Sequence, residues 1–85
     1  MDSVKEINKL FKLTEEFRLA CLVKLTKKLS EGYTGWDCEA IEPFKYKIVK
    51  LSKEELTQKN LINIANYCSF LWYRAESKKG GNLNE

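Results

Sequence analysis

Three polar and aromatic side chains in the last third of the chain could recognise a ligand. Asn60, Asn63 and Tyr67 are three and four residues apart, which places them on one face of a helix. Amides and a phenol in this arrangement can hydrogen-bond the polar edges of a small molecule. The same groups can instead bond a neighbouring helix, because buried polar side chains are normally paired. The pattern therefore leaves a recognition role and a packing role open.

Basic residues form the second feature with recognisable chemistry. Lys24 and Lys28 lie one helical turn apart. Further lysines in the middle of the chain are Lys27, Lys45, Lys47, Lys50 and Lys53. A cluster of ammonium groups attracts phosphates. Acids such as Glu31 and Glu39 are interspersed among them, and a mixed run of this kind is also typical of a solvated surface.

Trp36 lies in a segment where the helical periodicity stops and where Gly32, Gly35 and Pro43 interrupt the chain. Its indole ring could stack on a base or anchor a protein partner. The alternative is that the ring covers the end of a small core. Combining the three features, we expect one ligand pocket lined by Lys24, Lys28, Trp36, Asn60, Asn63 and Tyr67.

Several kinds of catalysis are excluded by composition. The chain has no histidine, so it has neither a Ser-His-Asp nor a Cys-His arrangement. No glycine-rich phosphate loop opens a helix, because Gly32 and Gly35 follow one. The three cysteines, Cys21, Cys38 and Cys68, contain no Cys-x-x-Cys pair, which argues against a structural zinc site. We expect no catalytic residue, no metal and no cofactor.

The charge balance and the apolar runs restrict the partners. Fifteen basic and twelve acidic residues give a net charge of +3, which permits an anionic ligand but does not favour nucleic acid. The longest uncharged run, residues 60–73, is shorter than the ~20 residues of a membrane span. The first ten residues lack the apolar stretch of a signal peptide. With an odd number of cysteines, this predicts a cytoplasmic protein with free thiols.

Hydrophobic periodicity predicts two long helices. Ser3 and Glu6 have capping-box spacing, so the first helix should begin there and end near Gly32, with Thr14 as a possible interruption. Ser52 and Glu55 repeat the spacing and predict a second helix that runs to about residue 74. Residues 31–43 should form a loop. Residues 44–51 fit a helix or a strand, and helix is favoured because a lone strand would lack a partner.

We therefore predict an all-α fold, in which an antiparallel helical hairpin with a connecting loop and a short helix packs into an oligomeric helical bundle. Residues 1–75 should form one helical domain, and residues 76–85 a disordered tail. A core this small rarely suffices alone. Because Phe70, Trp72 and Tyr73 are crowded at one helix end, we expect a homo-oligomer.

Three segments of the chain resemble a known family. They are residues 17–25 (FRLACLVKL), Gly35-Trp36-Asp37, and residues 62–67 (INIANY). Over residues 15–75 the chain is similar to the small MazG-like nucleotide pyrophosphohydrolase proteins of bacteriophages. The resemblance implies an all-α, oligomeric protein that cleaves nucleoside triphosphates, with magnesium held by a Glu-Glu-x-x-Glu helix and a later Glu-x-x-Asp helix.

The chain departs from this family at the acidic positions. Asn60 and Asn63 stand where the resemblance implies Glu and Asp. Glu54 and Glu55 are followed by residues 56–58 (LTQ), so the first acidic motif is also incomplete. A neutral amide offers magnesium an oxygen but no charge, and this cation needs charged ligands. We therefore expect a relative that no longer catalyses the reaction.

The function expected from these observations is binding. We predict a non-enzymatic, phage-type protein that holds or sequesters an anionic nucleotide-like ligand and thereby antagonises a host defence signal. If it is encoded by a phage, it would act in the cytoplasm of the infected cell. The alternative is an inhibitor that docks on a host or defence protein through its aromatic loop and basic face. An active MazG-like pyrophosphohydrolase is the third hypothesis.

Overall fold

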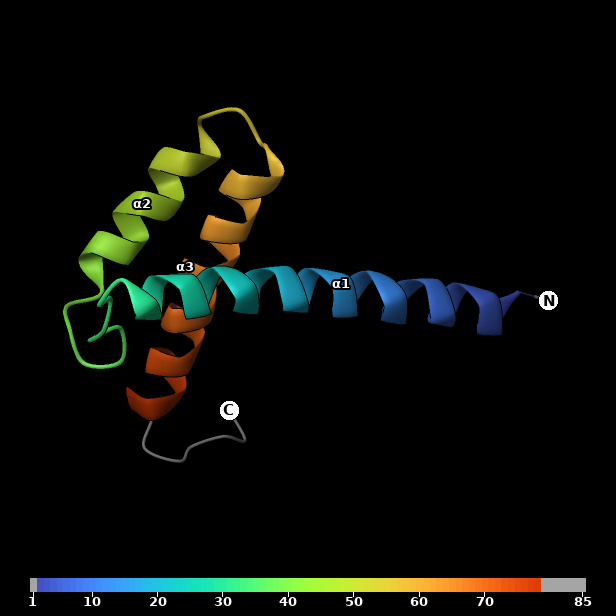
Figure 1. Ribbon diagram of the computed structural model, residues 1–85, viewed down its shortest axis with the longest axis horizontal. Coiled ribbons are helices and arrows are strands. Elements are labelled where there is room, and N and C mark those ends of the chain that lie inside the picture. Colours follow the sequence, from blue (N-terminus) through green and yellow to red (C-terminus); the bar gives the residue numbers. More distant parts are fainter. Residues whose placement is uncertain (1, 79–85) are drawn as a thin grey trace.

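The computed structural model describes residues 2–78, which form three helices and contain no strand (Figure 1). They are α1 (Ser3–Ser30), α2 (Glu42–Ser52) and α3 (Gln58–Lys78). The predicted all-α fold is confirmed, and the ambiguous segment 44–51 is helical. Within these residues, no helix combines the length and the apolar character needed to cross a membrane.

The start of α1 differs from the prediction in its capping. Asp2 is the N-cap, and its carbonyl accepts the backbone N–H of Glu6 at 2.8 Å. Ser3 is already helical, and no side chain caps this end, so the predicted Ser3–Glu6 capping box is wrong. Thr14 does not interrupt the helix. Its hydroxyl donates to the carbonyl of Phe11 at 3.0 Å, which satisfies the hydroxyl within the helix.

The predicted end of α1 at Gly32 is confirmed. Gly32 has a φ of +92°, a conformation that glycine adopts without a steric penalty. The Gly32 N–H donates to the carbonyl of Leu29 at 2.9 Å, and the Tyr33 N–H donates to that of Lys28 at 2.9 Å. These two bonds define a Schellman motif. The motif turns the chain sharply and places Tyr33 beside the end of α1.

The second long helix begins later than predicted. Ser52 is the last residue of α2, and its hydroxyl donates to the carbonyl of Val49 at 2.7 Å, so the predicted Ser52–Glu55 capping box is wrong. Thr57 caps α3 instead, because its hydroxyl oxygen accepts the N–H of Asn60 at 3.1 Å. At the other end, α3 continues to Lys78. The rest of the predicted tail, residues 79–85, lies outside the described residues.

Both α1 and α2 pack against α3. Helices α2 and α3 run in opposite directions and are joined by a short segment, so these two form a helical hairpin (Figure 1). Helix α1 crosses α3, and its first half projects away from the other two helices (Figure 1). The hairpin predicted between the two long helices is therefore not confirmed. The radius of gyration is 15.4 Å, against about 12 Å for a compact domain of this length.

The core is an aromatic cluster around Phe70, which is buried together with Phe44. The centre of the Phe70 ring lies 5.1 Å from that of Trp36 and 5.3 Å from that of Phe44. The rings of Tyr67 and Tyr33 follow at 6.2 and 6.4 Å. These distances are typical of favourable aromatic pairs. One side chain of α3 thus contacts α2 and the loop that follows α1.

The loop before α2 is held by α3. The guanidinium of Arg74 donates to the backbone carbonyls of Trp36, at 3.4 Å, and of Glu39. Trp36 also meets the ring of Tyr73 edge-on at 5.3 Å. Two turns at the end of α3 therefore fix the position of Trp36.

Replacement of Phe70 should remove a large part of the stability. Phe70→Ala leaves a cavity among four rings and should lower the free energy of unfolding by about 3–5 kcal/mol, whereas Phe70→Leu should cost less. Tyr46→Ala is the control, because Tyr46 is exposed on α2. It should change stability by less than about 0.5 kcal/mol. Urea unfolding followed by circular dichroism measures both, and equal midpoints would contradict this core.

The contact between α1 and α3 should protect one cysteine. Burial raises the pKa of the Cys21 thiol above its usual value, so less of it is thiolate near neutral pH. Cys38 and Cys68 are exposed. Iodoacetamide should therefore label Cys38 and Cys68 first, as followed by peptide mass spectrometry. Unfolding in guanidinium should equalise the three rates. Early labelling of Cys21 in the folded protein would show that α1 does not lie on α3.

Candidate functional site

A hollow of about 230 Å³ lies where the three helices meet. Its lining consists of Lys24, Leu25, Lys28, Tyr33, Lys47, Asn63, Asn66, Tyr67 and Phe70. Four of the six residues predicted from the sequence are in this set, namely Lys24, Lys28, Asn63 and Tyr67. The structure thus brings the predicted basic pair of the first helix against the predicted polar face of the last one.

Three lysines surround the hollow. Lys24 and Lys28 come from adjacent turns of α1, and Lys47 comes from α2. The Nζ atom of Lys47 lies 5.8 Å from the centre of the Tyr67 ring, within the range of a cation–π contact. No carboxylate is among the lining residues. Three positive charges around one small space favour the entry of an anion.

The polar wall contributed by α3 has a structural part and an accessible part. Asn66 is buried, and its Nδ2 atom donates to the backbone carbonyl of Cys21 at 3.3 Å. This bond joins α3 to α1. Asn63 and Tyr67 are half-buried and line the hollow one turn apart. The interhelical hydrogen bond is thus made by Asn66, which the sequence analysis did not single out, while Asn63 and Tyr67 line the hollow.

Tyr33 adds a hydrogen-bond donor to the hollow. Burial raises the pKa of its phenol, and electrostatic interactions with the nearby Tyr67 and Glu39 raise this pKa further. The phenol therefore stays protonated at neutral pH. A protonated phenol can donate to an anionic oxygen in the hollow.

Two of the predicted site residues lie elsewhere. The side-chain amide of Asn60 donates to the carbonyl of Glu55 at 2.8 Å and belongs to the start of α3. Trp36 is half-buried and stacks on Phe70, as a ring that covers a small core would. It lines a neighbouring, mostly apolar hollow of about 310 Å³ with Leu22, Leu25, Thr26, Leu29, Tyr33, Ser69 and Phe70. The two hollows share Leu25, Tyr33 and Phe70.

Sequence analysis did not assign Lys47 or Tyr33 to the site. A signal for Lys47 was present, because it follows the buried Phe44 by three residues and so shares the side of α2 that faces α3. Tyr33 reaches the hollow only because the turn at Gly32 redirects the chain. Helical periodicity ends at such a turn. The hydrophobic pattern of α1 therefore does not predict the direction of the Tyr33 side chain.

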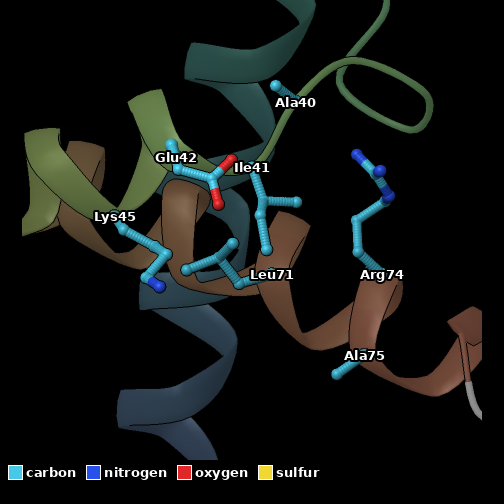
Figure 2. A pocket seen from close by; sticks show the side chains of 7 residues that line it. All are labelled: Ala40, Ile41, Glu42, Lys45, Leu71, Arg74 and Ala75. Atoms are coloured by element: carbon cyan, nitrogen blue, oxygen red, sulfur yellow. The ribbon is translucent and has the colours of Figure 1, made fainter.

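A larger hollow, of about 830 Å³, lies between the start of α2 and the end of α3 (Figure 2). Glu42 and Lys45 come from α2, and Leu71, Arg74 and Ala75 come from α3 (Figure 2). Arg74 is already bonded to loop carbonyls. Because an acid stands beside the two cations, this hollow lacks the concentrated positive charge of the smaller one.

Within residues 2–78, no three Cys, Asp or Glu side chains gather closely enough to hold a metal ion. No protein family, curated protein or solved structure matches the chain. The similarity to MazG-like proteins therefore stays a prediction. A functional proposal for this chain therefore depends on the arrangement of the described residues.

The bond between Asn66 and Cys21 should contribute measurably to stability. Asn66→Ala removes a partly buried hydrogen bond between α3 and α1 and should lower the free energy of unfolding by about 1 kcal/mol. Asn8→Ala is the matched control, because Asn8 is exposed on the projecting half of α1. Its effect should be a small gain in stability of about 0.5 kcal/mol, because alanine favours a helix more than asparagine does. Urea unfolding curves measure the difference, and equal stability of the two variants would contradict the contact.

Proposed function

We propose that this protein binds an anionic, nucleotide-like ligand without catalysing its conversion. The observation that supports the proposal is the convergence of Lys24, Lys28 and Lys47 on one hollow that also contains Asn63 and Tyr67. Each group has a chemical role. The ammonium groups attract a phosphate, the Asn63 amide can bond a polar edge, and the tyrosine rings close the sides.

The sizes of the two hollows favour a ligand with two chemically different ends. About 230 Å³ suits a phosphate group and is small for a whole drug-sized ligand, since such sites usually enclose about 300–1,000 Å³. The neighbouring hollow is apolar and contains the Trp36 ring. A nucleotide could place its phosphates among the lysines and its flat base near Trp36. The shared wall of Leu25, Tyr33 and Phe70 would lie between these two parts.

The absence of catalysis is part of the proposal. Asn60 and Asn63 are neutral at the positions where the MazG-like resemblance implies acids. The hollow is lined by three cations, which would repel a magnesium ion that arrives without its nucleotide. Tight binding without turnover suits a protein that removes a signalling nucleotide from solution. Antagonism of a host defence signal by a phage-type protein would be one such use.

A thermal-shift series tests this proposal. Pyrophosphate, ATP, a cyclic dinucleotide and ADP-ribose are added separately to the full chain, with sodium chloride as the control for ionic strength. A ligand at a hundred times its Kd should raise the free energy of unfolding by about 2.7 kcal/mol. This corresponds to a rise of several degrees in Tm. A matching rise with sodium chloride alone would indicate screening rather than a site.

Variants connect the shift to the hollow. Lys24→Gln with Lys28→Gln should abolish it, and Asn63→Leu should do so by removing polar recognition while keeping bulk. Lys5→Gln with Lys12→Gln changes the net charge equally on the projecting half of α1 and should leave the shift intact. Release of phosphate or pyrophosphate from ATP with magnesium, abolished by a chelator, would contradict the non-enzymatic role. No shift with any of the ligands would contradict binding.

A further inference from the structure

The apolar hollow beside Trp36 contains two aliphatic hydroxyl groups, one from each of the helices that form it. They belong to Thr26 of α1 and Ser69 of α3. Both hydroxyls donate their protons within their own helix. The Oγ1 atom of Thr26 donates to the carbonyl of Val23 at 2.8 Å, and the Oγ atom of Ser69 donates to the carbonyl of Asn66 at 2.8 Å.

A hydroxyl whose proton is already bonded can still accept a hydrogen bond. Serine and threonine oxygens each have two lone pairs and only one O–H donor. A bond from the hydroxyl to a carbonyl one turn earlier is common in helices, and a ligand would have to break it to obtain the proton. Thr26 and Ser69 therefore offer two acceptors to a ligand in the apolar hollow.

The other two polar side chains of this hollow, Tyr33 and Trp36, supply donors. Tyr33 also lines the lysine-lined hollow, where its phenol can donate to an anionic oxygen. The indole N–H of Trp36 can only donate, so it suits an unprotonated ring nitrogen. The apolar hollow is thus matched by a flat group that has an amino donor and a ring-nitrogen acceptor.

We infer that the base of the nucleotide-like ligand has an exocyclic amino group beside an unprotonated ring nitrogen, as adenine and cytosine have. This inference rests on the proposed function, because it concerns the base end of the same ligand. An amino group has two N–H bonds, which can be shared between the Thr26 and Ser69 oxygens. Hypoxanthine and uracil have a carbonyl oxygen in place of the amino group, which would set an acceptor against two acceptors.

The preference should be moderate, because both hydroxyls are also accessible to water. Thr26 and Ser69 are exposed, so a bond from the ligand replaces a bond from solvent. The net gain from such an exchange corresponds to about a tenfold difference in affinity.

Two matched pairs of nucleotides test the inference, namely ATP with ITP and CTP with UTP. The members of each pair have the same triphosphate and differ by an amino group against a carbonyl oxygen. The lysines should therefore contribute equally to both members. Isothermal titration calorimetry of the full chain, at constant ionic strength and with a chelator present, measures the four Kd values. ATP and CTP should each bind about tenfold more tightly than their partners.

A double variant connects the preference to the two hydroxyls. Thr26→Val with Ser69→Ala removes both oxygens with little change in shape, and it should bring the Kd of ATP to that of ITP. Thr14→Val with Ser52→Ala is the matched control, because these hydroxyls also donate to helical carbonyls, at 3.0 and 2.7 Å, and line neither hollow. The control should keep the tenfold ratio.

The possible results separate this inference from the proposed function. Equal Kd values within each pair, or tighter binding of ITP and UTP, would overturn the inference and leave anion binding intact. A tenfold ratio that persists in the Thr26 and Ser69 double variant would overturn it as well. If none of the four triphosphates binds, the proposed function fails and this inference fails with it.

Discussion

The packing of the Phe70 ring is the contact on which the remaining structure depends. Phe70 is buried on α3, and its ring meets Trp36 of the loop, Phe44 of α2 and Tyr33 at the end of α1. Among the residues whose burial is described, only Phe44 and Asn66 are buried besides Phe70. The walls of both neighbouring hollows include the same ring. The arrangement of the lysines is therefore a consequence of aromatic packing, since charge repulsion alone would move them apart.

Much of the fold follows from local patterns, and the errors at the helix ends occur where two local signals compete. The end of α1 was predictable because Gly32 can adopt a positive φ. The start of α3 was not, because Ser52 with Glu55 and the later Thr57 both have the chemistry of a cap. Thr57 prevails in the structure, where it accepts the Asn60 N–H. A capping pattern therefore identifies candidates, and here Ser52 is unavailable because it ends α2 and bonds the carbonyl of Val49.

The candidate site was predictable to the extent that it depends on helical spacing. Lys24 with Lys28, and Asn63 with Tyr67, are each set by neighbouring turns of a single helix. The two pairs face each other only because of the way in which α1 crosses α3. The crossing is fixed by contacts between residues far apart in the sequence, such as the hydrogen bond from Asn66 to Cys21. Trp36 lies in a loop without helical periodicity, so its position could not be deduced from the sequence. Its assignment to the pocket was therefore wrong, and the ring stacks on Phe70 instead.

The wall shared by the two hollows has a thermodynamic consequence. Leu25, Tyr33 and Phe70 face the lysine-lined space on one side and the apolar space beside Trp36 on the other. A group that enters one space and shifts these side chains alters the volume of the other. Any coupling free energy that results is reciprocal, so occupancy on the apolar side changes anion affinity by the same factor as the anion changes apolar affinity. Because the same three side chains line both hollows, a displacement of any of them changes both volumes at once.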